Sequence, residues 1–121
     1  MAKILFVEDE RALQGIFKDL LEKEGYEVVG AYDGKTGLRL AKSEKPDLIL
    51  LDLILPKLDG FEVLRELKKD PQLKDIPVIV LTHLEGVEDV QRAIELGAKT
   101  YLVKANYSLE EVVTKVKKSL E

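Results

Sequence analysis

Short apolar runs alternate with amphipathic segments along this chain, and this alternation restricts the fold more than any other feature. The runs Ile4–Val7 and Leu48–Leu51 contain only apolar residues, which suits strands buried on both faces of a sheet. Three further runs lie at Val28–Val29 (ending near Ala31), Pro77–Leu81 and Thr100–Val103. Strand and helix patterns that alternate in this way predict an α/β fold, with a parallel sheet covered by helices on both faces.

The segments between these runs have the periodicity and the end signals of helices. Gly25 is a natural stop for the first helix, and Ser108 with Glu111 forms the capping-box pattern of the last one. We find no repeat, linker or low-complexity segment, so residues 1–121 are predicted to form a single domain. The expected helices cover Ala12–Glu24, a segment around Leu38–Ala41 that ends before Pro46, Phe61–Lys69, Val87–Leu96, and a segment from Ser108 that buries Val112, Val113, Val116 and Leu120.

Composition excludes several classes of function. The chain has no cysteine, which rules out thiol catalysis and thiolate metal sites, and its one histidine, His83, rules out a His-rich metal site. The formal net charge of -4 argues against direct binding of nucleic acid. No apolar run is long enough to span a membrane, so we expect a cytoplasmic protein without membrane insertion.

Polar residues stand where the predicted strands end. Glu8 and Asp9 follow the first strand, Asp52 the third, Thr82 the fourth and Lys104 the fifth. In an open parallel sheet, ligands bind beyond the carboxyl ends of the strands. The pattern therefore predicts one cleft with three carboxylates, a hydroxyl and an ammonium group, a set that can receive a phosphoryl group.

Each of these residues also has an ordinary structural interpretation. Asp52 could cap a turn, Glu8 and Asp9 could be first-turn acids of the next helix, Thr82 could finish a strand, and Lys104 could be a solvated surface residue. Taken together they favour a bound cation, because two carboxylates about 4 Å apart repel by roughly 4 kcal/mol at an effective dielectric constant near 20. Oxygen ligands suit Mg²⁺ or Mn²⁺ rather than zinc.

The same residues carry a resemblance to a known family. The chain from Lys3 to its last helix resembles the CheY-like receiver domain of two-component response regulators. That resemblance implies a flavodoxin-like three-layer (βα)5 sandwich, with five parallel strands in the order 2-1-3-4-5. The motifs that carry it are Glu8-Asp9, Asp52-Leu53-Ile54-Leu55-Pro56-Lys57-Leu58-Asp59-Gly60, Thr82 and Tyr101-Leu102-Val103-Lys104.

The resemblance implies roles for the site residues. Asp52 would accept a phosphoryl group from the phosphohistidine of a sensor histidine kinase or of a histidine phosphotransfer protein. Asp9, Asp52 and the backbone carbonyl of Ile54 would bind Mg²⁺, or Mn²⁺ in its place, and Glu8 would act directly or through water. Lys104 would pair with Asp52 before the transfer and with the phosphoryl group after it.

The resemblance also implies a switch. Thr82 would move toward the phosphoryl oxygen and Tyr101 would turn inward, which would remodel the surface of the fourth helix, fifth strand and fifth helix for a downstream protein partner. Without the resemblance, Tyr101 could instead be a half-buried edge-strand residue with a hydrated hydroxyl, and only the resemblance makes it a switch residue. The same surface could serve as a homodimer interface. The chain would not be an enzyme in the usual sense, since it would catalyse only its own Mg²⁺-dependent phosphorylation and slow dephosphorylation.

Three features depart from the family pattern. Ala105 stands where the family commonly has a cis-proline, so we predict a trans peptide bond after Lys104, an altered loop and a less firmly aimed Lys104. His83 replaces a small residue, and it either narrows access to the site or hydrogen-bonds the bound phosphoryl group. Ile54 and Leu84 offer nothing to orient an attacking water, which predicts slow self-dephosphorylation.

Other functional classes fit the residues less well. A phosphohydrolase of the haloacid-dehalogenase type needs a second acid where Ile54 stands. A flavodoxin-like FMN-binding protein needs a Ser/Thr/Gly-rich phosphate loop, but the first loop here is Glu8-Asp9-Glu10 and would repel phosphate. Because of His83 and Ala105, a receiver-like module that binds partner proteins without phosphorylation stays open as the alternative.

Overall fold

Five parallel strands form one sheet in the order β2-β1-β3-β4-β5 in the computed structural model, which describes residues 1–121. The predicted sheet and its strand order are therefore confirmed. The central strands β1, β3 and β4 are almost entirely buried, as their apolar runs require. The strands are β1 (Lys3–Val7), β2 (Glu27–Ala31), β3 (Leu48–Leu51), β4 (Val78–Thr82) and β5 (Thr100–Val103).

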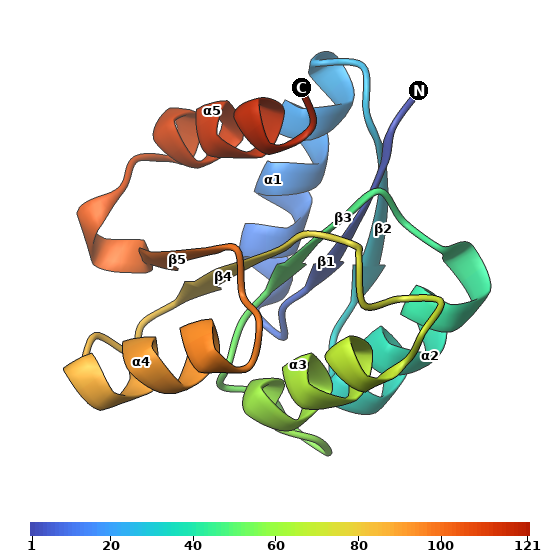
Figure 1. Ribbon diagram of the computed structural model, residues 1–121. Helices are drawn as coiled ribbons and strands as arrows, with labels where there is room; N and C mark the ends of the chain where they lie inside the picture. The colour runs from blue at the N-terminus through green and yellow to red at the C-terminus, as the bar shows by residue number, and fades with distance from the viewer.

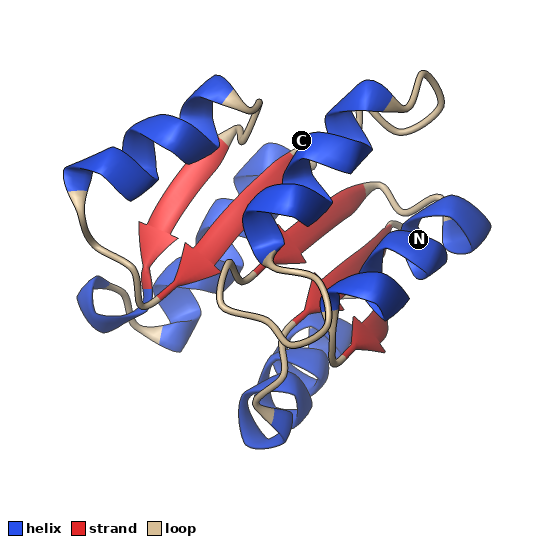
Figure 2. Cartoon of the chain, turned by 90° about the horizontal axis from the view of Figure 1, so that it is seen from below, coloured by secondary structure: helices blue, strands red, loops and turns tan.

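Five α-helices cover the two faces of the sheet. Helices α1 and α5 pack on one face and α2, α3 and α4 on the other, so the molecule has three layers (Figures 1 and 2). A short 3₁₀ turn, η1 (Lys104–Asn106), follows β5 and was not predicted. The helices are α1 (Arg11–Lys23), α2 (Gly34–Glu44), α3 (Gly60–Lys69), α4 (Val87–Glu95) and α5 (Leu109–Ser119).

Alternate residues of each central strand enter two separate cores. In β1, Leu5 and Val7 join the core under α2, α3 and α4, whereas Ile4 and Phe6 join the core under α1 and α5. Phe6 packs edge-on against Phe17 of α1, with the ring centroids 5.4 Å apart. Burying each such large apolar side chain stabilises the fold by about 1.5–3 kcal/mol.

The predicted helix ends agree with the structure, but one helical stripe differs. The Ser108 hydroxyl accepts from the Glu111 N–H and the Glu111 carboxylate accepts from the Ser108 N–H, so the capping box is confirmed. In α1, Ile16 belongs to the expected apolar stripe but is 46% exposed, whereas Gln14 is buried. Leu120 is only partly buried against the α5 core. No helix combines the length and the hydropathy that a transmembrane span requires.

The strand order places the carboxyl ends of β1, β3, β4 and β5 along one edge of the sheet. The chain leaves β1 toward β2 on one side, whereas β3 lies on its other side. Such a reversal opens a crevice beyond the strand ends, where ligands of this architecture bind. The residues that follow these strands are the ones that the sequence singled out.

Candidate functional site

Lys104 joins two acidic residues at this edge of the sheet. Its Nζ lies 2.6 Å from Oε1 of Glu8 and 3.0 Å from Oδ2 of Asp52. Burial lowers the pKa of the Lys104 ammonium, but the hydrogen bond to Glu8 and the charge of Asp52 outweigh this effect and raise the pKa above its ordinary value. The ammonium is therefore charged at neutral pH. The predicted convergence of these three residues is confirmed.

Glu8 is the most enclosed carboxylate of the site. One of its oxygens accepts from Lys104, and the other accepts from the backbone N–H of Glu10 at 3.0 Å. Burial raises the pKa of Glu8 to about 7, although the hydrogen bond from Lys104 opposes this shift. Both carboxylate oxygens are thus already engaged. A carboxylate has about four lone-pair positions, so each oxygen retains capacity for one further partner.

Asp9 completes the group of acids and is its exposed member. One carboxylate oxygen from each of Glu8, Asp9 and Asp52 lies within 4.8 Å of the others. The Asp9 carboxylate accepts none of the hydrogen bonds within the protein and faces solvent. Three hard oxygen donors, one of them free, fit a divalent cation such as Mg²⁺ or Mn²⁺.

The loop after β3 holds Asp52 firmly. Asp52 is buried, and its Oδ1 accepts from the backbone N–H of Ile54 at 3.2 Å. Helix α3 begins directly against this turn. A Cβ atom on Gly60 would lie 2.3 Å from the Asp52 carbonyl oxygen and 2.4 Å from the Cα of Leu53. Only glycine allows this approach, which explains the Asp59-Gly60 pair at the end of the loop.

The two predicted switch residues lie on neighbouring strands. Thr82 ends β4 and is fully buried, and its hydroxyl accepts from the Leu84 N–H at 3.4 Å. Tyr101 is half-buried on the edge strand β5, and its hydroxyl donates to the Leu84 carbonyl oxygen at 2.8 Å. Burial, together with the charges of Asp89 and Asp52, raises the pKa of Tyr101 to about 12. Both residues therefore contact the backbone of Leu84, in the loop between β4 and α4.

The departures from the family pattern have clear structural outcomes. The chain contains no cis peptide bond, so the predicted trans bond between Lys104 and Ala105 is confirmed. Lys104, the first residue of η1, still places its ammonium beside Asp52 and Glu8 without the proline, and its less firm aim stays a prediction. His83 is exposed, and it lines a hollow of about 170 Å³ together with Lys104 and Tyr107.

Gln14 belongs to this edge although no sequence pattern marks it. Its amide nitrogen lies within hydrogen-bonding distance of the carbonyl oxygens of Phe6, Glu8 and Ala31. Apolar residues alone define the helical periodicity of α1, and a glutamine beside Leu13 has no distinctive signal. Its only hint is Gly30, which leaves room for the amide on β2.

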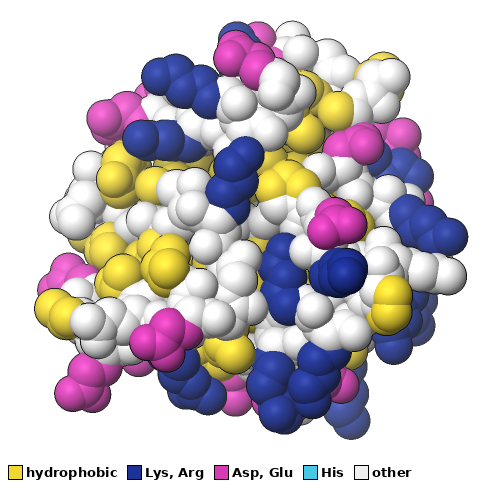
Figure 3. All heavy atoms as spheres, in the orientation of Figure 1, with side chains coloured by type: hydrophobic (Ala, Val, Ile, Leu, Met, Phe, Trp, Pro, Cys, Tyr) yellow, Lys and Arg dark blue, Asp and Glu magenta, His cyan; other side chains and the backbone are white.

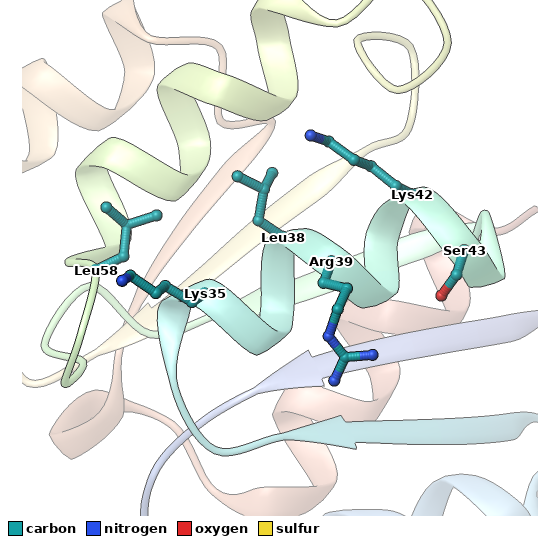
Figure 4. Close-up of a pocket in the computed structure, with 6 residues that line it drawn as sticks. All are labelled: Lys35, Leu38, Arg39, Lys42, Ser43 and Leu58. Atoms are coloured by element: carbon teal, nitrogen blue, oxygen red, sulfur yellow. The ribbon is translucent and has the colours of Figure 1, made fainter.

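The widest hollow on the surface is separate from the acid cluster. It has a volume of about 530 Å³ and lies between α2 and the loop before α3 (Figure 4). It has no acidic residue and includes none of the predicted site residues, so it is not a site for the chemistry expected here. Its lining consists of Lys35, Leu38, Arg39, Lys42, Ser43 and Leu58.

The fold and the site together define a CheY-like class of protein, a doubly wound domain with carboxylates and a lysine at the carboxyl edge of its sheet. The model of the response regulator receiver domain family matches residues 4–117. The chain belongs to this family, and the resemblance drawn from its motifs is confirmed.

Two relatives with similar sequences are transcriptional regulators. The chain is 41% identical over 117 residues to the DNA-binding dual master transcriptional regulator RpaA of Synechocystis, an alignment that covers 97% of this chain and 48% of RpaA. It is 42% identical over 115 residues to the alkaline phosphatase synthesis transcriptional regulatory protein PhoP of Bacillus subtilis, covering 95% of this chain and 47% of PhoP. The chain thus spans about half the length of these relatives.

Solved structures of similar proteins have the same fold. The chemotaxis protein CheY4 of Vibrio cholerae superimposes with a TM-score of 0.91 at 31% identity, over 99% of each chain. The Mn²⁺-bound form of response regulator Rcp1 superimposes with a TM-score of 0.84 at 36% identity, over 98% of this chain and 91% of Rcp1. The flavodoxin-like, CheY-like architecture is therefore confirmed.

Proposed function

We propose that Asp52 accepts a phosphoryl group from the phosphohistidine of a sensor histidine kinase or of a histidine phosphotransfer protein. The observation that carries this proposal is the position of the Lys104 ammonium, 3.0 Å from Asp52 and 2.6 Å from Glu8. A rigid, buried strand presents the carboxylate, and a fixed cation lies beside it. Membership of the receiver family supports the same role.

The transfer forms one bond and breaks one. A carboxylate oxygen of Asp52 bonds to phosphorus while the bond between phosphorus and the histidine nitrogen of the donor breaks, and the imidazole keeps that electron pair. Asp52 attacks as the carboxylate, so the step removes no proton from it. The Lys104 ammonium stabilises the negative charge of the transferring group.

The residues that would hold Mg²⁺, or Mn²⁺ in its place, are Asp9, Asp52 and the backbone carbonyl of Ile54. Glu8 would act directly or through water. When bound, the cation would supply positive charge to the phosphoryl oxygens. The Mn²⁺-bound form of Rcp1 supports the choice of a hard divalent cation.

The chain acts on no separate substrate in this proposal. It catalyses its own phosphorylation and a slow loss of the phosphoryl group. Ile54 and Leu84 flank the site with aliphatic side chains, and neither can orient a water molecule for attack on phosphorus. His83 lies exposed beside Lys104, where it narrows the approach of large donors.

Phosphorylation changes the loop between β4 and α4. The new group adds charge and acceptor oxygens beside Thr82, whose hydroxyl moves toward it. That movement releases the contact of Thr82 with the Leu84 N–H, while Tyr101 contacts the carbonyl of the same residue. The switch therefore acts through the two polar groups of Leu84, and Tyr101 turns inward in response.

The surface of α4, β5 and α5 receives the downstream partner. Val87 and Ile94 of α4 are 71% and 47% exposed, which leaves apolar area uncovered. Hydrophobic and acidic side chains lie together at the lower left of the molecule, over α4 (Figure 3). This surface suits a protein partner or a second copy of the chain rather than nucleic acid.

A module that binds partners without phosphorylation is the alternative function. His83 and the Ala105 that stands in place of the family proline favour this alternative. The structure weakens one of these reasons, since Lys104 reaches Asp52 without the proline.

Intact mass measurement tests the proposal. The protein is incubated with Mg²⁺ and a small acyl-phosphate donor, and we expect it to gain the mass of one phosphoryl group. Asp52→Asn should gain nothing. Asp59→Asn is the matched control, because it removes a carboxylate from the same loop but keeps an N-cap residue for α3. No gain in the natural protein, or an equal gain in Asp52→Asn, would overturn the proposal.

A further inference from the structure

The amide group of Gln14 reaches three backbone carbonyls beside the acid cluster. Its Nε2 lies 2.8 Å from the carbonyl oxygen of Phe6, 2.9 Å from that of Ala31 and 3.1 Å from that of Glu8. An amide nitrogen has two hydrogens, so the three acceptors share them. Three acceptors around one atom also establish that this end of the amide is the nitrogen. Gln14 is only 4% exposed, so α1 buries a polar group at the edge of the sheet.

The backbone carbonyl of Glu8 accepts its hydrogen bond from this amide. Pairing of β1 with β2 ends at Val7 and Ala31, and the Glu8 N–H still donates to the Ala31 carbonyl at 2.9 Å. Beyond Ala31 the chain turns toward α2, so no N–H of β2 stands opposite the Glu8 carbonyl. Gln14 Nε2 supplies the missing donor and continues the connection between the two strands by one residue.

The same carbonyl controls the direction of the next residue. The peptide group that contains the Glu8 carbonyl is planar and leads directly to Asp9. The Asp9 carboxylate has no hydrogen bond of its own, so its position depends on its backbone. We propose that Gln14 is a positioning residue for the cation site, which acts through the Glu8–Asp9 peptide group and touches no cation itself. This inference rests on the proposed function, in which Asp9 holds the cation.

Gly30 on β2 provides an independent way to disturb the amide. A Cβ atom at this position would lie 2.8 Å from Gln14 Oε1, which is closer than real Cβ atoms come. Because that oxygen is the end of a flexible side chain, it can move, and the amide nitrogen must move with it. Gly30→Ala therefore shifts the amide while every atom of Gln14 is still present.

Titration of the full chain with Mn²⁺, with the free ion measured by electron paramagnetic resonance, tests this proposal without any phosphorylation. Gln14→Met keeps the length of the side chain and removes the donor, and we expect its Mn²⁺ dissociation constant to rise about tenfold. Gly30→Ala should raise the constant severalfold. In the Gln14→Met background, Gly30→Ala should have no further effect on Mn²⁺ binding, because the amide it displaces is gone.

A control variant separates the proposed effect of Gln14 on the position of Asp9 from a general loss of fold stability. Val116→Ala truncates a fully buried side chain in α5, far along the chain from both strands, and lowers the thermal midpoint. Its Mn²⁺ dissociation constant should stay that of the natural protein. If Gln14→Met binds Mn²⁺ within twofold of the natural protein, or if Val116→Ala loses affinity to the same extent, the positioning role is overturned while phosphorylation of Asp52 stands. If the natural protein binds no Mn²⁺, the proposed function fails as well.

Discussion

Replacing Lys104 with methionine tests how much its ammonium group stabilises the fold by neutralising the buried carboxylates of Glu8 and Asp52. The Glu8 and Asp52 side chains are 1% and 5% exposed, and that of Lys104 is 10% exposed. Removing one partner of a buried ion pair costs about 3–5 kcal/mol. Lys104 keeps some contact with water, so we expect the lower end, a loss of about 3 kcal/mol in the free energy of unfolding. At about 4 °C per kcal/mol for a domain of this size, the thermal midpoint should fall by roughly 12 °C.

The assay is thermal unfolding followed by circular dichroism, in EDTA and in saturating Mg²⁺, above neutral pH so that Glu8 is ionised. Mg²⁺ should raise the midpoint of Lys104→Met more than that of the natural protein, since the cation replaces the lost positive charge. Lys117→Met is the matched control. Lys117 pairs with Glu24 at 3.1 Å on the surface, and such a pair contributes at most about 1 kcal/mol. Equal small losses in the two variants, with equal effects of Mg²⁺, would refute the reasoning.

Three further predictions concern charge, water and helix capping. In EDTA, Asp52→Asn should raise the thermal midpoint by about 4 °C, or about 1 kcal/mol, because it relieves repulsion among the acids while Lys104 keeps its partner Glu8; a lower midpoint would contradict the acid cluster. Ile54→Asn should speed the decay of phosphorylated protein severalfold, because an amide can orient water; unchanged decay, followed by intact mass, would count against this. Asp33→Ala should cost about 1 kcal/mol at neutral pH, because the Asp33 carboxylate caps α2 through the Thr36 N–H. That hydrogen bond lowers the pKa of Asp33, so the contribution is present above the ordinary value near 4 and is lost as pH falls through the lowered value. Urea unfolding of both proteins across this range should show the difference disappear in acid.

The sheet and most of the site could be predicted because both follow local rules. A short aliphatic run such as Leu48–Leu51, between helical patterns, favours a buried strand, and the parallel topology then brings the residues after such strands to one edge. Details that depend on distant segments could not be read in this way. The hydrogen bond from Lys104 to Glu8 joins residues 96 positions apart in the chain. The hydrogen bond from Tyr101 to the Leu84 carbonyl depends on the conformation of the loop that contains Leu84. Gln14 is buried instead of Ile16 because Gly30 on the neighbouring strand leaves space for its amide. The periodicity of a helix gives no information about such a space.

In the proposed function, the bonds of Lys104 explain how the site would respond to a single phosphoryl group. Glu8, Asp9 and Asp52 lie close together, and the ammonium group of Lys104 is shared between two of them. A phosphoryl group on Asp52 would add further negative charge at the same point, and the Lys104 ammonium would then interact with more oxygens. The Thr82 hydroxyl is free to donate to such a group, because it donates to no atom of the protein and only accepts a long hydrogen bond from the Leu84 N–H. The Leu84 carbonyl accepts a hydrogen bond from the Tyr101 hydroxyl, so in the proposed switch a movement of Thr82 would reach β5 and the start of α4 through the backbone of Leu84.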